Sequence, residues 1–76
     1  PTTLVARSND SFISTKVKSA LIASKAVNGR RIKVVTEDGV VYLMGLLTRD
    51  EAEAAVTRAG SVYGVKKIVE AFEYIN

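Results

Sequence analysis

The sequence predicts a small α+β domain with the element order α-β-β-α-β, in which a three-stranded mixed sheet has two helices packed on one face. Three observations predict this fold: a helical period of apolar residues near the N-terminus, two β-rich runs separated by Asp38-Gly39, and a capping-box sequence before a second helical run. The chain has 76 residues, enough for one domain near the lower size limit for an unaided hydrophobic core.

Residues 10–25 have the spacing of an amphipathic helix, while residues 1–8 show no clear period and are expected to form a linker or tail. Asn9 or Asp10 can cap the helix, since a side-chain oxygen there accepts a backbone N–H that the first turn leaves unpaired. Asn28-Gly29 can end it, because both residues tolerate the left-handed conformation. The expected inner face consists of Ile13, Val17, Ala20, Leu21 and Ser24.

The clearest local signal is a hairpin of residues 31–37 and 40–46, since Asp38-Gly39 is favoured in a two-residue type I′ turn. Such a turn places Glu37 opposite Val40. It also pairs Val35 with Tyr42, Val34 with Leu43 and Ile32 with Gly45. The face expected to pack against helices holds Ile32, Val34, Thr36, Val41, Leu43 and Gly45. The other face holds Arg31, Lys33, Val35, Glu37, Val40, Tyr42, Met44 and Leu46, which is unusually apolar for a face in water.

The second helix begins at a capping box, with Thr48 as N-cap and Glu51 three residues later. Gly64 can end it, and its small inner side chains allow close approach to a sheet: Ala52, Ala55, Val56, Ala59 and Val62. Residues 65–75 then alternate as a third strand. The sequence leaves open which set faces the helices: Ile68, Glu70, Phe72 and Tyr74, or Val69, Ala71, Glu73 and Ile75.

The composition argues against catalysis. The chain contains no Cys and no His, which excludes a disulfide, a thiolate nucleophile and the most common general base and transition-metal ligand. A core this small also leaves little room for a deep cleft. The acids Asp50, Glu51 and Glu53 are explained as first-turn residues that complement a helix dipole. We therefore expect no enzyme activity, no catalytic residue, no metal and no cofactor, and we favour a binding role.

The charge distribution points to a polyanionic partner. Residues 1–36 contain seven of the eleven Lys and Arg residues and one acid, whereas residues 37–76 contain seven acids. A basic segment of this kind suits a phosphate backbone or an anionic lipid surface, and the alternative is a solvated basic face. No run approaches the ~18 apolar residues of a membrane-spanning helix. Because the chain begins Pro-Thr-Thr, we expect an excised domain or a processed product, with any anchor outside this sequence.

The outer side of the first helix offers a candidate lipid site. Phe12 and Ile22 fall on the side expected to meet solvent, among hydroxyl groups and Lys side chains, and no acid occurs between Ser11 and Thr36. This pattern is typical of a helix whose apolar side chains enter a membrane while ammonium groups meet lipid phosphates. The expected lipid-binding residues are Phe12, Lys16, Lys18, Ser19, Ile22 and Lys25. Alternatively, Phe12 packs on Leu4 or Val5, or a neighbouring domain covers both apolar residues.

The open sheet face offers a second candidate surface, formed by Val35, Val40, Tyr42 and Met44. Tyr42 beside Lys33 and Arg31 could stack on a nucleic-acid base. Its aliphatic neighbours suit a protein contact better, so nucleic acid ranks behind both lipid and protein as a partner.

Four segments together resemble the BON domain family over residues 9–75: NDSFISTKVKSALIAS, VVTEDGVVYLMG, LLTRDEAEAA and VYGVKKIVEAFEYI. The most specific elements are Gly45 at the end of the second strand, Thr48 to Ala52 at the helix start, and Gly64-Val65 before the last strand. Within the family the chain is similar to the second BON domain of dual-BON outer-membrane lipoproteins, which makes residues 1–8 the end of an interdomain linker and 9–76 the domain.

The resemblance implies the α-β-β-α-β fold and a non-catalytic role in envelope integrity. It also implies a periplasmic location at the inner leaflet of the outer membrane. For the lipoprotein type it implies that the first helix contacts an anionic phospholipid such as phosphatidylglycerol, with Phe12 where an aromatic residue is expected. The alternative partner is a second BON domain or an envelope protein at the sheet face. The sequence lacks the lipobox Cys and the first BON domain of such a lipoprotein.

Overall fold

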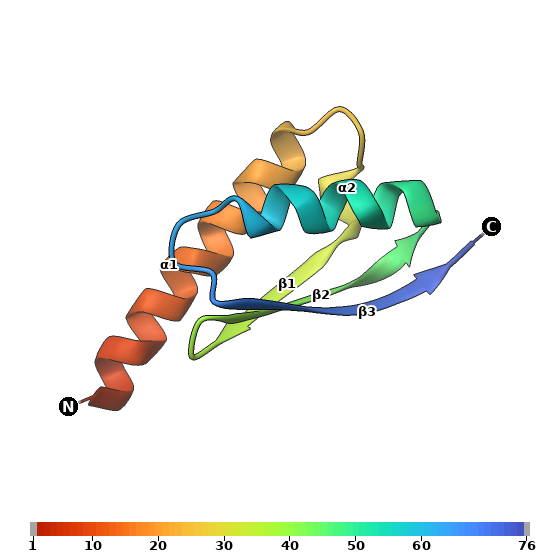
Figure 1. Ribbon diagram of the computed structural model, residues 1–76. Helices are drawn as coiled ribbons and strands as arrows, with labels where there is room; N and C mark the ends of the chain where they lie inside the picture. The colour runs from red at the N-terminus through yellow and green to blue at the C-terminus, as the bar shows by residue number, and fades with distance from the viewer. Residues whose placement is uncertain (1, 76) are drawn as a thin grey trace.

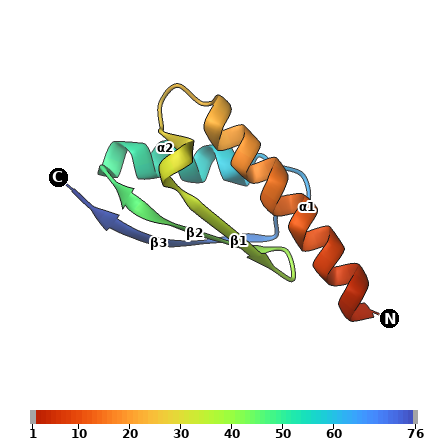
Figure 2. The same ribbon diagram turned by 180° about the vertical axis from the view of Figure 1, so that it is seen from behind.

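The computed structural model describes the backbone of residues 2–75 and the side chains of residues 9–75. Both helices lie on one face of a three-stranded sheet, and α1 crosses the sheet obliquely so that its N-terminal part extends past the sheet (Figures 1 and 2). The predicted α+β fold with the order α-β-β-α-β is confirmed. Its elements are α1 (Thr2–Ala23), the 3₁₀ turn η1 (Gly29–Arg31), β1 (Lys33–Glu37), β2 (Val40–Leu47), α2 (Arg49–Gly60) and β3 (Lys67–Tyr74).

The sheet has the order β1-β2-β3, with β1 and β2 antiparallel and β2 and β3 parallel. Asp38 and Gly39 both have positive φ, 51° and 80°, as a type I′ turn requires. The predicted hairpin register is confirmed from Glu37–Val40 to Val34–Leu43. The same register continues to Lys33–Met44, and Ile32 lies beside Gly45, where a Cβ would be 3.5 Å from the Ile32 Cα. The first strand begins two residues later than predicted, at Lys33, because the Ile32 N–H closes the 3₁₀ turn by donating to the Gly29 carbonyl at 3.2 Å.

The first helix begins earlier than predicted. It starts at Thr2, so neither Asn9 nor Asp10 is its N-cap. The Asp10 carboxylate instead accepts the backbone N–H groups of Asp38, at 2.9 Å, and Gly39, at 3.1 Å, and so holds the hairpin turn against α1. The assignment of residues 1–8 to a linker stays a prediction, and packing of Phe12 on Leu4 or Val5 lies outside the described side chains.

The end of α1 also differs from the prediction. The helix ends at Ala23, and Asn28 caps η1 by accepting the Arg30 N–H at 3.3 Å. Gly29 is buried beside α1, where a Cβ would lie 2.4 Å from the Leu21 carbonyl carbon and 2.5 Å from the Ile22 nitrogen. The glycine is therefore required by close packing of the loop on the helix, and not by a left-handed helix end.

The second helix begins as predicted. Thr48 accepts the Glu51 N–H at 3.1 Å, and the Glu51 carboxylate accepts the Thr48 N–H at 3.0 Å. The hydrogen bond from the Thr48 backbone lowers the pKa of Glu51 from its usual value of 4.5. The helix ends at Gly60, four residues before the predicted end, and Gly64 lies in a turn with φ of 100°.

The core lies between the sheet and the two helices. Its buried apolar residues are Ile13, Val17, Leu21, Val27, Ile32, Val41, Leu43, Leu47, Ala52, Ala55 and Ala59. The three Ala side chains allow α2 to approach the sheet closely. Ile68 and Phe72 pack against this core, so the strand set that contains them faces the helices. Val69 and Ala71, at alternate positions, belong to the open face.

Candidate functional site

The outer side of α1 presents two large apolar side chains to solvent. Phe12 is 62% exposed and Ile22 46% exposed, and the hydroxyl residues Thr15 and Ser19 between them are also exposed. Ten residues of helix separate the two apolar groups, which is about 15 Å along the axis. At about 100° per residue, the two side chains point about 80° apart around the helix axis, so Phe12 lies on one flank of the solvent-facing side of α1 and Ile22 on the other.

Lys16 joins the Phe12 flank to the loop between α2 and β3. Its Nζ atom lies 4.8 Å from the centroid of the Phe12 ring and 5.7 Å from that of the Tyr63 ring. The same atom donates a hydrogen bond to the Tyr63 carbonyl at 2.9 Å. Lys16 therefore contacts two aromatic rings from separate elements.

Tyr63 is the residue of this cluster that the sequence reasoning missed, and 91% of its side chain is exposed. The available signal was an aromatic residue in a short segment flanked by Gly60, Ser61 and Gly64, whose small side chains cannot bury a ring. Figure 1 shows this loop beside α1, and Figure 2 shows the same contact from behind.

Lys18 contacts the protein main chain. Its ammonium group donates to the Gly29 carbonyl at 2.8 Å and also to the Ile32 carbonyl. Lys18 and Ser19 share a shallow hollow between α1 and β1 with Ser14, Thr15, Lys33 and Val34. The structure thus divides the expected lipid-binding residues: Phe12 and Lys16 lie with Tyr63, Lys18 and Ser19 lie near β1, and the exposed Lys25 follows the end of α1.

The open sheet face is wider than the hairpin alone. Tyr42 lies between Val35 and Val69 in the register, and Met44 lies between Lys33 and Ala71. Val40, Tyr42 and Met44 are half-buried, Val35 is exposed, and Leu46 is 44% exposed. The third strand therefore extends the apolar surface that the sequence predicts for Val35, Val40, Tyr42 and Met44.

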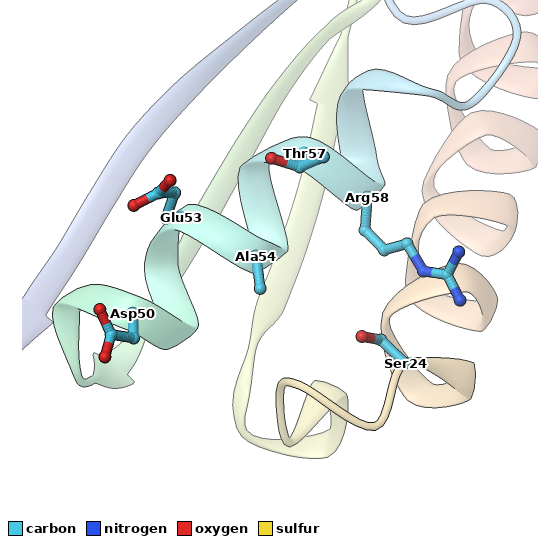
Figure 3. A pocket seen from close by; sticks show the side chains of 6 residues that line it. All are labelled: Ser24, Asp50, Glu53, Ala54, Thr57 and Arg58. Atoms are coloured by element: carbon cyan, nitrogen blue, oxygen red, sulfur yellow. The ribbon is translucent and has the colours of Figure 1, made fainter.

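A second hollow lies between the end of α1 and the outer side of α2, lined by Ser24, Asp50, Glu53, Ala54, Thr57 and Arg58. Arg58 extends toward Ser24, whereas the carboxylates of Asp50 and Glu53 lie at the opposite end (Figure 3). Within residues 2–75, no group of three or more acidic residues is placed to hold a metal ion, and no helix is long and apolar enough to cross a membrane. The arrangement provides exposed charge on a helix surface rather than a reactive pair.

Comparison with known proteins identifies the family of this fold. Residues 9–76 match the BON domain model. The chain belongs to the BON domain family. This BON domain is 38% identical over 69 residues to the outer membrane lipoprotein DolP of Haemophilus influenzae, a match that covers 91% of the chain and 36% of that protein. It is 41% identical over 66 residues to a 21 kDa hemolysin of Actinobacillus pleuropneumoniae, covering 87% of the chain and 34% of that protein. The chain thus spans about a third of the length of these relatives.

Proposed function

We propose that this BON domain is a non-catalytic module that binds anionic phospholipid, such as phosphatidylglycerol, through the outer side of α1. The observation that supports this most directly is the exposure of Phe12 and Ile22 on a helix surface with Lys side chains and without acids from residue 11 to residue 36. Apolar groups of this kind enter the acyl boundary while ammonium groups meet phosphates.

The expected binding is weak and reversible. Full burial of a Phe or Ile side chain contributes roughly 1.5–3 kcal/mol, and each Lys near a strongly anionic surface adds about 1 kcal/mol. Phe12 and Ile22 are already partly covered by the protein, so each contributes less than the full value.

The similarity to an outer membrane lipoprotein supports a place for this domain in the bacterial envelope. We place it in the periplasm at the inner leaflet of the outer membrane, in support of membrane integrity, with the anchor outside this sequence. A peripheral module suits such a position, because an anchored chain needs only modest affinity to stay on the surface.

Co-sedimentation with vesicles tests the proposal. The domain is expected to bind vesicles that contain phosphatidylcholine and phosphatidylglycerol, and not to bind vesicles of phosphatidylcholine alone. Binding should weaken as the salt concentration rises, because salt screens the Lys charges. Ile22→Ala should weaken binding. Leu46→Ala is the matched control, since Leu46 is 44% exposed against 46% for Ile22 but lies on the open sheet face. Equal binding to both vesicle types, or no binding to either, would refute the proposal.

A second candidate function is protein binding through the open sheet face, with a second BON domain or an envelope protein as partner. The pattern of charge around this face favours it. In the sheet register, Glu37 lies across from Lys67 at the hairpin end. At the opposite end of the sheet, Lys33 lies on the edge strand β1 and Glu73 on the edge strand β3. Negative and positive side chains therefore alternate around the four corners of the face. Two such faces related by a two-fold axis along the strands would bring negative corners onto positive ones.

Sedimentation velocity over a range of chain concentrations tests this second function with a second copy as partner. Self-association is expected to be lost in Met44→Lys, which places a charge in the centre of the apolar surface, and to be retained in Ile22→Ala. A chain that stays monomeric at every concentration would exclude pairing between identical domains and leave an unlike partner to be sought.

A further inference from the structure

The loop between α2 and β3 is built to present Tyr63 to solvent. The Val65 N–H donates to the Val62 carbonyl at 3.3 Å, which closes a four-residue turn with Tyr63 at its tip. Gly64 follows with φ of 100°, the left-handed conformation that the third position of a type II turn requires. The 91% exposure of Tyr63 therefore results from a defined turn.

This turn is fixed against α1 at two points. A Cβ on Gly64 would lie 3.3 Å from the Ile13 side chain, so the turn packs directly on the helix. One helical turn further along, the Lys16 ammonium group donates to the Tyr63 carbonyl and lies close to the Phe12 and Tyr63 rings. An ammonium group has three N–H donors, so Lys16 can keep this bond while it binds a phosphate oxygen.

In space, the end of this loop lies beside the hairpin turn with its acids Glu37 and Asp38, because the Lys66 N–H donates to the Gly39 carbonyl at 2.9 Å. In sequence, the segment that carries Tyr63 has the same charge character as α1. Residues 54–69 contain Arg58, Lys66 and Lys67 and no acid, just as residues 11–36 contain none. The cluster of Phe12, Lys16 and Tyr63 thus lies where two acid-free segments meet. Charge complementarity identifies an anionic surface as its partner.

We propose that the Tyr63 turn is a second membrane contact, so that the domain rests on an anionic bilayer through both α1 and the α2–β3 loop. This inference rests on the proposed lipid binding and adds to it an element and an orientation. Phe12 enters the acyl boundary, and Tyr63 lies at headgroup depth, where an aromatic ring with a hydroxyl group is most stable. The contact is then centred on the Phe12 flank of α1, and Ile22 lies toward its edge.

Single-Trp variants test this arrangement, because the chain contains no Trp. Phe12→Trp, Tyr63→Trp and the control Tyr74→Trp are compared on phosphatidylcholine vesicles with and without phosphatidylglycerol. Tyr74 is 40% exposed at the far end of β3 from the turn. On anionic vesicles the emission of the first two variants should shift to the blue, and shallow brominated lipids should quench Tyr63→Trp more strongly than deep ones. The emission of the control variant should be the same with and without vesicles.

The outcomes separate the two proposals. If Phe12→Trp responds and Tyr63→Trp does not, the second contact is refuted and the proposed function stands. If neither responds, both fail. If the control responds as well, the domain enters the bilayer without a fixed orientation and the inference fails. Tyr63→Ala should in addition weaken vesicle binding by about threefold to tenfold, the loss expected for one interfacial ring, with an unchanged circular dichroism spectrum.

Discussion

Replacing Lys18 by Met should destabilise the domain by about 2 kcal/mol, because the Lys18 ammonium group holds the loop after α1 in place. It donates to the carbonyls of Gly29, the first residue of η1, and Ile32, the residue that follows η1. Hydrogen bonds to a charged group contribute roughly 1.5–3 kcal/mol each, and partial exposure reduces the sum. Met keeps most of the aliphatic stem, so the loss comes mainly from the two carbonyls that no longer receive a donor.

Urea unfolding followed by circular dichroism measures this loss. A domain of this size has a urea dependence of about 1 kcal/mol per M, so the midpoint should fall by about 2 M. Lys25→Met makes the same substitution at an exposed position after α1 and should change stability by less than about 0.5 kcal/mol. Lys18→Arg, which keeps a charged donor, should lose less than Lys18→Met. If Lys18→Met unfolds at the same urea concentration as Lys25→Met, the bonds to η1 contribute nothing and the reasoning is wrong.

Four further substitutions test single positions. Gly29→Ala should destabilise the domain by about 1–3 kcal/mol in the same urea assay, since its Cβ would lie 2.4 Å from the Leu21 backbone. Gly60→Ala should instead stabilise α2 by about 0.5–1 kcal/mol, because the nearest atom to its Cβ is 3.7 Å away and Ala favours the helix over Gly. Asp10→Ala should cost about 1–3 kcal/mol, because two N–H groups of the hairpin turn lose their acceptor. Because the pKa of Glu51 is lower in the folded domain than its usual 4.5, the ionised carboxylate stabilises the fold above pH 4.5, and this stabilisation is lost as pH falls through the folded-state pKa. In Glu51→Gln, the free energy of unfolding should therefore depend less on pH in this range.

The fold was predictable because its strongest signals are local. The Asp38-Gly39 turn fixes its own strand register, and Thr48 and Glu51 satisfy each other's backbone within one helical turn. The start of α1 was not predictable in the same way. Asp10 has the side chain of an N-cap, but its partners are the N–H groups of a turn 28 residues later. Nothing in the sequence around Asp10 distinguishes these two uses of the carboxylate.

The orientation of the third strand was open for a related reason. Its alternate positions hold two partly apolar sets, one with Ile68 and Phe72 and the other with Val69 and Ala71. Periodicity shows only that the two sets face opposite sides. Packing decides between them, because the small residues of α2 leave space above the sheet that Ile68 and Phe72 fill.

For the candidate site, the sequence predicted that Phe12 and Ile22 are exposed, but it did not predict which contacts each Lys side chain makes. Lys16 and Lys18 are two residues apart on one helix and look equivalent in the sequence. In the structure Lys16 lies beside two aromatic rings, while Lys18 is bound to main-chain carbonyls. A long Lys side chain selects its partner through tertiary structure, so helical periodicity can place its Cα but not its charge. Loss of vesicle binding in Lys18→Glu would therefore indicate lipid contact only if the variant remains folded.

Exposed apolar area alone does not choose between the two surfaces, because Ile22 on α1 and Leu46 on the sheet are exposed to nearly the same extent, 46% and 44%. The surrounding charge supports a different proposed partner for each surface. Residues 11–36 contain no acid, whereas Glu37 and Glu73 lie at corners of the sheet face. An anionic bilayer attracts the first surface and meets carboxylates on the second. The outer side of α1 is therefore suited to lipid, and the sheet face, with both signs of charge around an apolar centre, is suited to another protein.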